Sequence, residues 1–162
     1  LIFSNVGDKT VYELPSYLQY DEISKAHETN IEVYQHSIHH PDSMEVVKLK
    51  NDYSNLWAHL NHLYASNDVE AGKKFYTEDW FKHISNHYEG VSIPFVLRED
   101  LKIELHILNW AWVGLVCCAI DSNVVLRYVL PDGSMDTTIV TLGVVLLYQG
   151  SNWRVDDMRV LN

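Results

Sequence analysis

The chain has 162 residues, of which 47% are apolar and 21% are charged, an ordinary globular mixture that can fill one core. Its 12 Lys and Arg residues stand against 22 Asp and Glu residues, so the formal net charge is -10 and the pI is about 5.2. This acidity excludes nucleic acid as the main partner and excludes docking on anionic lipid heads, because both need a basic surface. No apolar run reaches the length of a membrane span.

The first residues and the two cysteines leave the cellular compartment open. The chain starts at Leu1 without Met, which fits the removal of a signal peptide or membrane anchor and fits a simple choice of boundary equally well. Cys117 and Cys118 are adjacent, so a disulfide between them would be strained and both are expected to be free thiols. They form no metal-binding pattern, and one of them is expected to pack in the core.

The N-terminal part of the chain predicts one helix. Residues 1–15 have no clear period. Within residues 16–37, apolar and aromatic side chains recur at helical spacing: Tyr20, Ile23, His27, Ile31 and Tyr34. The segment from His39 to Ser43 contains Pro41 and is typical of a break between elements.

A longer amphipathic helix is predicted directly after this break. Asp42 or Ser43 can cap it, and Glu45 stands where a capping box places a carboxylate. Its apolar side chains make one continuous stripe: Val46, Leu49, Tyr53, Leu56, Trp57, Leu60, Leu63 and Tyr64. The stripe ends near Ser66.

Two shorter helices follow in the prediction. Asp68 can cap one that runs to Phe75, and Thr77 can cap another that Gly90 ends. The second one carries a face of apolar and aromatic side chains: Trp80, Phe81, Ile84 and Tyr88.

After Pro94 the pattern changes to alternating or continuously apolar, which predicts strands near 102–111, 115–130, 136–149 and 153–161. Three turn signals separate these strands, so they indicate an antiparallel meander. The second strand would span about 53 Å if it were flat, at about 3.3 Å per residue. A small domain cannot contain a flat strand of that length, so we expect a curled sheet with a bulge near residues 121–123.

Helices that precede a segregated antiparallel sheet predict the α+β class, with N-terminal helices packed on a strongly curved sheet. One face of the sheet is apolar and needs a cover, and the helix that contains Trp57 is its natural partner. A curved sheet wrapped over a long helix would form a cone with one open end.

This pattern resembles the nuclear transport factor 2-like superfamily over residues 44–162. The resemblance depends on the long amphipathic helix, the helical stretch from Phe75 to Phe81, and above all the closing hairpin. In that hairpin an apolar strand ends at Tyr148-Gln149-Gly150 and a strand led by Trp153 follows. Residues 1–43 match nothing in the pattern and are interpreted as a partly helical N-terminal extension.

The resemblance implies a fold and several possible functions. The superfamily includes isomerases, dehydratases, epoxide hydrolases and polyketide cyclases, and it also includes transport adaptors and assembly modules. Its enzymes place an Asp, His or Tyr among apolar side chains at the open end of the cone, where burial raises a carboxyl pKa.

The catalytic candidates on the strands are Asp157, Tyr128 and His106. By alternation, Asp157 shares a face with Trp153 and Val155, and Arg159 is its expected salt partner. The competing interpretation is an ordinary surface ion pair. Other ionisable strand residues are Asp121, Arg127, Tyr148 and Asp156. No set of two carboxylates and a Tyr points at one site, as an isomerase would need.

Metal binding and thiol catalysis are less favoured. His83 and His87 are four residues apart on a predicted helix, and His59 and His62 are three apart, but no third ligand completes either set. Cys117 and Cys118 have no neighbouring base or cation that would activate a thiol. No metal and no cofactor is therefore expected.

The aromatic residues indicate a binding module. In a cone, the expected pocket residues are Trp57, Tyr53, Trp80, Trp110, Tyr128 and Tyr148, which suit a small apolar ligand. Trp112 and Arg127 are the expected interface residues of a homodimer that packs sheet against sheet, because a sheet that is apolar on both faces usually has a cover on the second. Coverage of that face by residues 1–43 is the alternative. The leading hypothesis is a non-catalytic ligand-binding or assembly module, and the alternative is an isomerase, dehydratase or hydrolase with a pocket carboxylate.

Overall fold

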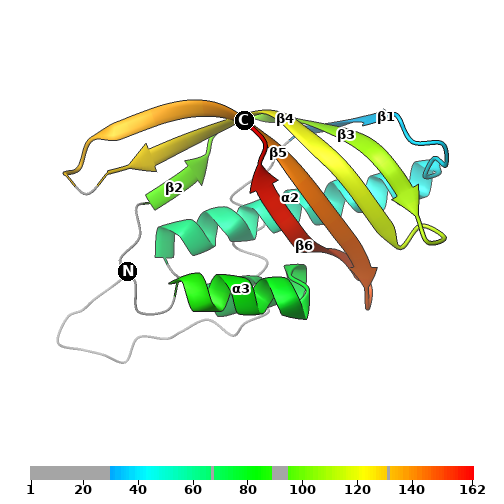
Figure 1. Cartoon of the computed structure of the whole chain (residues 1–162), viewed down its shortest axis with the longest axis horizontal. Helices are drawn as coiled ribbons and strands as arrows, with labels where there is room; N and C mark the ends of the chain where they lie inside the picture. Colours follow the sequence, from blue (N-terminus) through cyan, green and yellow to red (C-terminus); the bar gives the residue numbers. More distant parts are fainter. Residues whose placement is uncertain (1–29, 67, 89–94, 131) are drawn as a thin grey trace.

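The protein is α+β, with three helices packed against a six-stranded, mostly antiparallel sheet in the part of the chain that is described here. That part of the computed structural model comprises residues 30–66, 68–88, 95–130 and 132–162. In Figure 1 the sheet curves over the long helix, which lies beneath it. In chain order the elements are β1 (Asn30–Gln35), α2 (Ser43–Ser66), η1 (Val69–Phe75), α3 (Glu78–Tyr88), β2 (Phe95–Arg98), β3 (Lys102–Ala111), β4 (Val116–Val129), β5 (Met135–Gln149) and β6 (Asn152–Val160).

The predicted meander is confirmed. Strands β3, β4, β5 and β6 are antiparallel neighbours in that order, and their bounds lie within about a residue of the predicted ones. Two strands extend this sheet. β1 pairs in parallel with β3, and β2 pairs with the far half of β4, beyond the part of β4 that β3 occupies.

The predicted bulge is also confirmed. The register of β4 against β5 shifts between Asp121 and Val124, and Asn123 has a left-handed φ of 58°. Two further shifts occur, in β3 near Leu108 and in β6 at Asp156. Each bulge bends its strand and increases the local twist, which lets strands of up to 15 residues wrap around a helix.

The predicted helix over residues 16–37 is wrong where the structure describes it. Residues 30–35 form β1, and residues 16–29 lie outside the described part. Ile31 and Tyr34 fit a helical spacing, but Ile31 and Val33 also alternate with polar neighbours, and it is this period that the sheet uses. Ile31 faces the core, while Glu32 forms a salt bridge with Lys102 on β3, with 2.9 Å between Oε1 and Nζ.

The helix caps follow the prediction. Asp42 Oδ1 accepts from the Glu45 amide at 2.8 Å, and Glu45 Oε1 accepts from the Asp42 amide at 2.9 Å, so Asp42 rather than Ser43 is the capping residue of α2. Asp68 caps η1 by accepting from Ala71, and Thr77 caps α3 by accepting from the Trp80 amide at 3.2 Å.

The core lies between α2 and the inner face of the sheet. The predicted stripe is buried at Leu49, Tyr53, Leu56, Trp57, Leu60 and Leu63. Opposite it, the inner face contributes alternate residues of the long strands: Ile103, Leu105, Ile107, Cys117, Ala119, Leu142, Val144 and Leu146. No helix in the described ranges is long and apolar enough to cross a membrane.

Candidate functional site

A hollow of about 290 Å³ opens between α2, α3 and the sheet. Each of the elements α2, α3, β2, β4, β5 and β6 contributes to its wall. The lining is formed by Trp57, Trp80, His83, Ile84, Val96, Leu126, Tyr128, Leu142, Met158, Arg159 and Val160. This volume lies at the lower end of the range for small-molecule sites, so it suits a small ligand.

The wall of this hollow is mostly apolar, and its N–H and O–H groups come from two Trp side chains, His83, Tyr128 and Arg159. Arg159 is its only charged member, and no Asp or Glu is among the residues that line it in the described structure. The indole ring of Trp80 stacks on His83 with 5.0 Å between ring centroids. The Trp80 Nε1 is buried and has no hydrogen-bond partner among the residues that the structure describes.

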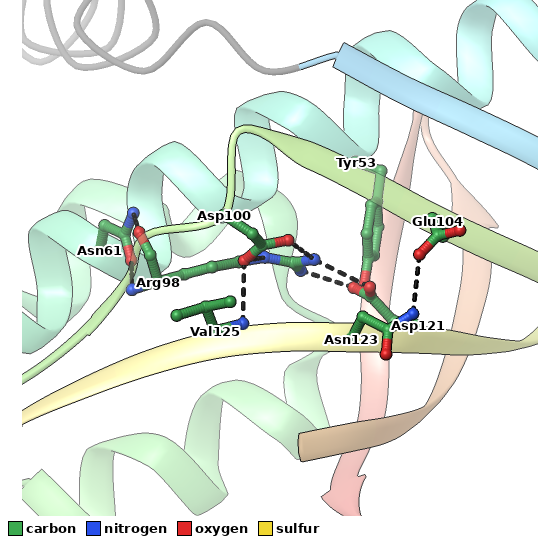
Figure 2. Close-up of polar contacts among 8 residues, drawn as sticks. All are labelled: Tyr53, Asn61, Arg98, Asp100, Glu104, Asp121, Asn123 and Val125. Carbon is green, nitrogen blue, oxygen red and sulfur yellow. Dashed lines mark hydrogen bonds and ion pairs between the residues drawn. The ribbon is translucent and has the colours of Figure 1, made fainter. Parts of the chain in front are cut away.

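A buried ionic cluster lies behind Trp57, and Figure 2 shows its members. Arg98 donates to Asp121 through Nη1 to Oδ2 at 2.5 Å and through Nη2 to Oδ1 at 2.8 Å. It also donates to Asp100 through Nε and Nη2, both at 2.8 Å. The Tyr53 hydroxyl on α2 donates to Asp121 Oδ2 at 2.5 Å. We call these four residues the Arg98 cluster.

The backbone around the Arg98 cluster is bonded as well. Asn61 on α2 accepts from the Arg98 amide at 3.0 Å and donates to the Arg98 carbonyl at 3.4 Å. Asp100 Oδ1 accepts from the Val125 amide at 3.1 Å. The cluster therefore ties α2, β2 and β4 together at the place where β4 bulges (Figure 2).

The surroundings of the Arg98 cluster keep Arg98 positively charged and the Tyr53 hydroxyl protonated. Burial opposes the charge of the Arg98 guanidinium, but the hydrogen bonds to Asp121 and Asp100 outweigh it and raise the pKa of Arg98. Burial, followed by the charge of Asp121, raises the pKa of Tyr53 well above its usual value. Arg98 and Asp121 thus form an ion pair that solvent does not reach, since Asp121 is completely buried.

Trp57 connects the cluster to the hollow. The Arg98 guanidinium lies over the Trp57 ring at 4.6 Å from its centroid, which is a cation–π contact. Trp57 also lines the hollow. The cluster consequently supports one wall of the hollow, while its own polar side-chain atoms form hydrogen bonds with one another.

The expected pocket residues divide among three places. Trp57, Trp80 and Tyr128 line the hollow described above. Trp110 and Tyr148 line a second hollow of about 340 Å³ beside the first turns of α2 and the β3–β4 turn. Tyr53 lies in the core between them, with its hydroxyl on Asp121.

The three catalytic candidates lie apart from one another. Tyr128 lines the hollow, whereas the His106 ring stacks on Tyr34 near the sheet edge and contacts His36 at 3.0 Å. Asp157 forms the expected ion pair with Arg159, Nη2 to Oδ2, at 2.5 Å. No hydrogen bond or ion pair joins any two of these three described residues.

The expectation that Asp157 shares the face of Trp153 and Val155 is wrong. The bulge at Asp156 inserts one residue, so Val155 pairs with Leu146 on the inner face while Asp157 pairs with Val145 on the outer face. Asp156 itself accepts a hydrogen bond from the Thr77 hydroxyl at 2.8 Å and so holds the start of α3 against β6.

The histidines lie in different surroundings. His59 is buried against Phe75, and burial lowers its pKa to about 4, with smaller contributions from His62 and Lys74. His62 lies 3.3 Å from Asp68, and the side chain of His87 falls outside the described residues. Within the described ranges no group of three His, Cys, Asp or Glu residues could hold a metal ion.

Both cysteines are free, as expected. Cys117 packs in the core, and burial raises its pKa to about 12, so its thiol stays protonated near neutral pH. Cys118 points to the opposite face, where it pairs across the ladder with Val145.

The predicted interface residues lie at the surface. Trp112 is at the tip of the β3–β4 turn with 77% of its surface exposed, and Arg127 forms an ion pair with Glu99 at 3.2 Å. The side of the sheet away from α2, which we call the outer face, carries an apolar band in which every member is half-buried: Val116, Cys118, Ile120, Val145 and Leu147.

Arg98 and Asp100 were missed by the sequence interpretation. Residues 98–100 are Arg-Glu-Asp, which is typical of a solvated loop. The one available signal was Asp121, a lone carboxylate inside the apolar run of β4, because a charge in such a run needs a partner if it faces the core.

No protein-family model matches this chain, and no curated protein matches it significantly.

Proposed function

We propose that this protein is a non-catalytic module of the nuclear transport factor 2-like type that holds a small apolar ligand in the hollow between α2, α3 and the sheet. The single observation that carries the proposal is the composition of this hollow. Its wall consists mainly of aromatic and aliphatic side chains from six elements, and His83, Tyr128 and Arg159 add polar groups. Walls of this kind are typical of small-molecule sites, in which a few polar groups orient an apolar ligand.

The rigidity of the wall supports binding. Trp57 is held from behind by the Arg98 guanidinium, and Trp80 is held by the Thr77 cap and its bond to Asp156. A preformed pocket loses little conformational entropy when a ligand enters. The hollow therefore has the kind of fixed walls that a binding module needs.

The alternative, an isomerase, dehydratase or hydrolase with a pocket carboxylate, has less support. Asp121 is the deepest carboxylate of the described chain, and its two oxygens already accept from Arg98 and Tyr53. Asp157 is paired with Arg159, and the bulge at Asp156 places it on the outer face of the sheet. An acid–base reaction in this hollow would depend on His83 or Tyr128 without a carboxylate in the wall.

The outer face supports a second proposal, assembly of two copies sheet to sheet. Its apolar band runs across β4 and β5, and Leu161 lies over Gly143 beside it. An apolar band that is left half-exposed on a sheet face often marks an interface. Sedimentation equilibrium at micromolar concentration tests this role, and a monomeric mass together with unchanged mass in Val145→Lys would overturn it.

The ligand-binding proposal is tested with an uncharged fluorescent probe, N-phenyl-1-naphthylamine. We expect saturable binding to the full chain and at least tenfold weaker binding to Val96→Trp, which places a large ring in the hollow. Ile139→Trp is the matched control, because Ile139 is exposed on β5 and away from the hollow. Equal binding to all three proteins, or no binding to the unaltered chain, would overturn the proposal.

A further inference from the structure

The hollow adjoins a groove of about 510 Å³ between α3 and β6. The two cavities share four wall residues, two from each element: Trp80, His83, Met158 and Arg159. A molecule whose body fills the hollow is therefore well placed to extend an end group into the groove. The charges of the groove then decide which end groups are favourable.

The groove carries more negative than positive charge. Asp79 lines it from α3, Asp156 and Asp157 line it from β6, and Arg159 is the one Lys or Arg among its described wall residues. Arg159 is already paired with Asp157, with 2.5 Å between Nη2 and Oδ2. Asp156 accepts a hydrogen bond from the neutral Thr77 hydroxyl at 2.8 Å. Among the described residues, Asp79 and Asp156 therefore lack a counter-ion.

Two further groups reduce this negative charge without reversing it. Asp79 lies in the first turn of α3, where the helix dipole is equivalent to about half a positive charge, which is less than the full charge of one carboxylate. His83 adds a positive charge only when it is protonated. The groove therefore attracts a cation and repels an anion, and the net charge of -10 on the whole chain acts in the same direction.

The hollow indicates which kind of cation would bind. Within the described ranges no group of three His, Cys, Asp or Glu residues could hold a metal ion. An organic cation needs fewer carboxylates, because burial of its apolar body contributes most of the binding free energy. Trp80 belongs to the walls of both cavities and is the type of aromatic residue that attracts ammonium groups most strongly.

From these observations we propose that the ligand is an organic cation with an apolar body, of the arylalkylammonium class. The apolar body occupies the hollow, and the ammonium group lies in the groove that Asp79 and Asp156 line. This inference depends on the proposed function, because it assigns a ligand class to the same hollow.

The test uses three naphthalene probes that differ in one substituent: 2-naphthylmethylammonium, the uncharged 2-naphthylmethanol and the anion 2-naphthoate. Dissociation constants are measured by calorimetry for the unaltered chain, for Asp79→Asn and for Val96→Trp, which obstructs the hollow. We expect the ammonium probe to bind most tightly and the naphthoate most weakly. Asp79→Asn should weaken the ammonium probe relative to the alcohol by about 3- to 5-fold, the usual effect of one solvent-exposed charge pair. Val96→Trp should weaken all three probes.

The matched control is Asp132→Asn, which makes the same change of carboxylate to amide in the β4–β5 turn, outside both cavities. Its Oδ1 can still accept from Ser134, and the ratio of ammonium to alcohol affinity should stay unchanged. An unchanged ratio in Asp79→Asn, or an alcohol or naphthoate that binds at least as tightly as the ammonium probe, overturns the ligand class. The proposed function still stands in that case if Val96→Trp weakens binding. An ammonium probe that binds Val96→Trp as tightly as the unaltered chain also overturns the ligand class, and failure of every probe to bind overturns the proposed function itself.

A measurement on the unaltered chain covers the case in which Asp79→Asn does not fold. An increase in ionic strength from about 0.1 M to about 1 M shortens the Debye length from about 10 Å to about 3 Å. The ratio of ammonium to alcohol affinity should then fall by at least about twofold, because salt screens the ionic attraction but acts equally on the two naphthalene bodies. A ratio that stays constant would contradict the contact between the ammonium group and the carboxylates.

Discussion

Arg98 and Asp121 are joined inside the protein by two hydrogen bonds, from Nη1 to Oδ2 at 2.5 Å and from Nη2 to Oδ1 at 2.8 Å. Arg98 comes from β2, which the sequence interpretation did not anticipate, and Asp121 comes from the bulge of β4. Such a pair is costly to bury. Substitution of only one of the two residues is more costly still, because the other charge then stays in the core without its counter-ion.

We therefore expect Asp121→Asn to lower the free energy of unfolding by about 3–5 kcal/mol. Arg98 would keep Asp100 but would lose its central partner, and the Tyr53 hydroxyl would lose a charged acceptor. Urea titration followed by circular dichroism measures this change.

The control for this change is Asp157→Asn, which breaks an ion pair at the surface. Arg159 is 70% exposed, so this change should cost less than about 1 kcal/mol. Similar losses in the two variants would mean that the Arg98 cluster contributes no more than a surface pair.

The sequence predicts most of the sheet because the strands follow simple rules. The alternation of apolar residues sets the bounds of β3 to β6, and the length of β4 alone requires the bulge near residue 121. The edge elements escape this reasoning. β1 has only six residues and fits two periods, and β2 is too short to show any period.

The candidate site is less predictable than the fold, for a physical reason. Trp57, Trp80 and Tyr128 are recognisable as aromatic residues on inward faces, and they do line one hollow. Tyr148 shares this inward pattern, and the bulge near Leu108 turns Trp110 inward as well, but both lie beside the other end of α2. Which hollow a side chain lines depends on its position along the axis of α2. The alternation of apolar residues shows only that a side chain points inward, and it does not show this position. The Asp156 bulge similarly reverses the face of Asp157 with no signal in the residues themselves.

The cap of α2 leads to a prediction about two adjacent residues. Asp42→Ala should lower the free energy of unfolding by about 1 kcal/mol, because it removes the acceptor for the Glu45 amide. Ser43→Ala should change it by less than about 0.5 kcal/mol, since Ser43 does not act as the cap. Urea titrations of both variants at the same pH provide the comparison. A larger loss in Ser43→Ala would identify Ser43 as the capping residue instead.

Buried His59 makes the stability depend on pH. Its pKa is about 4 in the folded protein and about 6.5 when exposed, because burial opposes the charged form. Between these values the unfolded chain binds more protons, so stability falls as pH decreases from 6.5 toward 4. The contribution lost between pH 7 and pH 5 should be on the order of 1–2 kcal/mol.

Unfolding titrations of His59→Gln at several pH values check this origin. Gln does not titrate, so the slope of stability against pH between 7 and 5 should become smaller. His40→Gln, at an exposed position, is the control and should keep the original slope. The assignment fails if both variants retain it. His62, Lys74 and Asp68 lie near His59 and are unchanged in each variant.

The β3–β4 turn stores backbone strain that one substitution should release. Trp112 and Val113 both have φ of 55°, and Gly114 follows with φ of 78°, so the turn is a short left-handed segment. A β-branched residue is unfavourable there by roughly 1–2 kcal/mol.

The Val113 side chain is fully exposed, so Val113→Gly removes this strain without a loss of packing. We expect it to raise the free energy of unfolding by about 1 kcal/mol, despite the added freedom of the unfolded chain. The control is Val47→Gly, at a Val that is also exposed but lies within α2, where Gly should instead lower stability by about 0.5 kcal/mol. Urea midpoints that move in opposite directions would confirm the strain, and a loss of stability in Val113→Gly would show that Val113 is held without it.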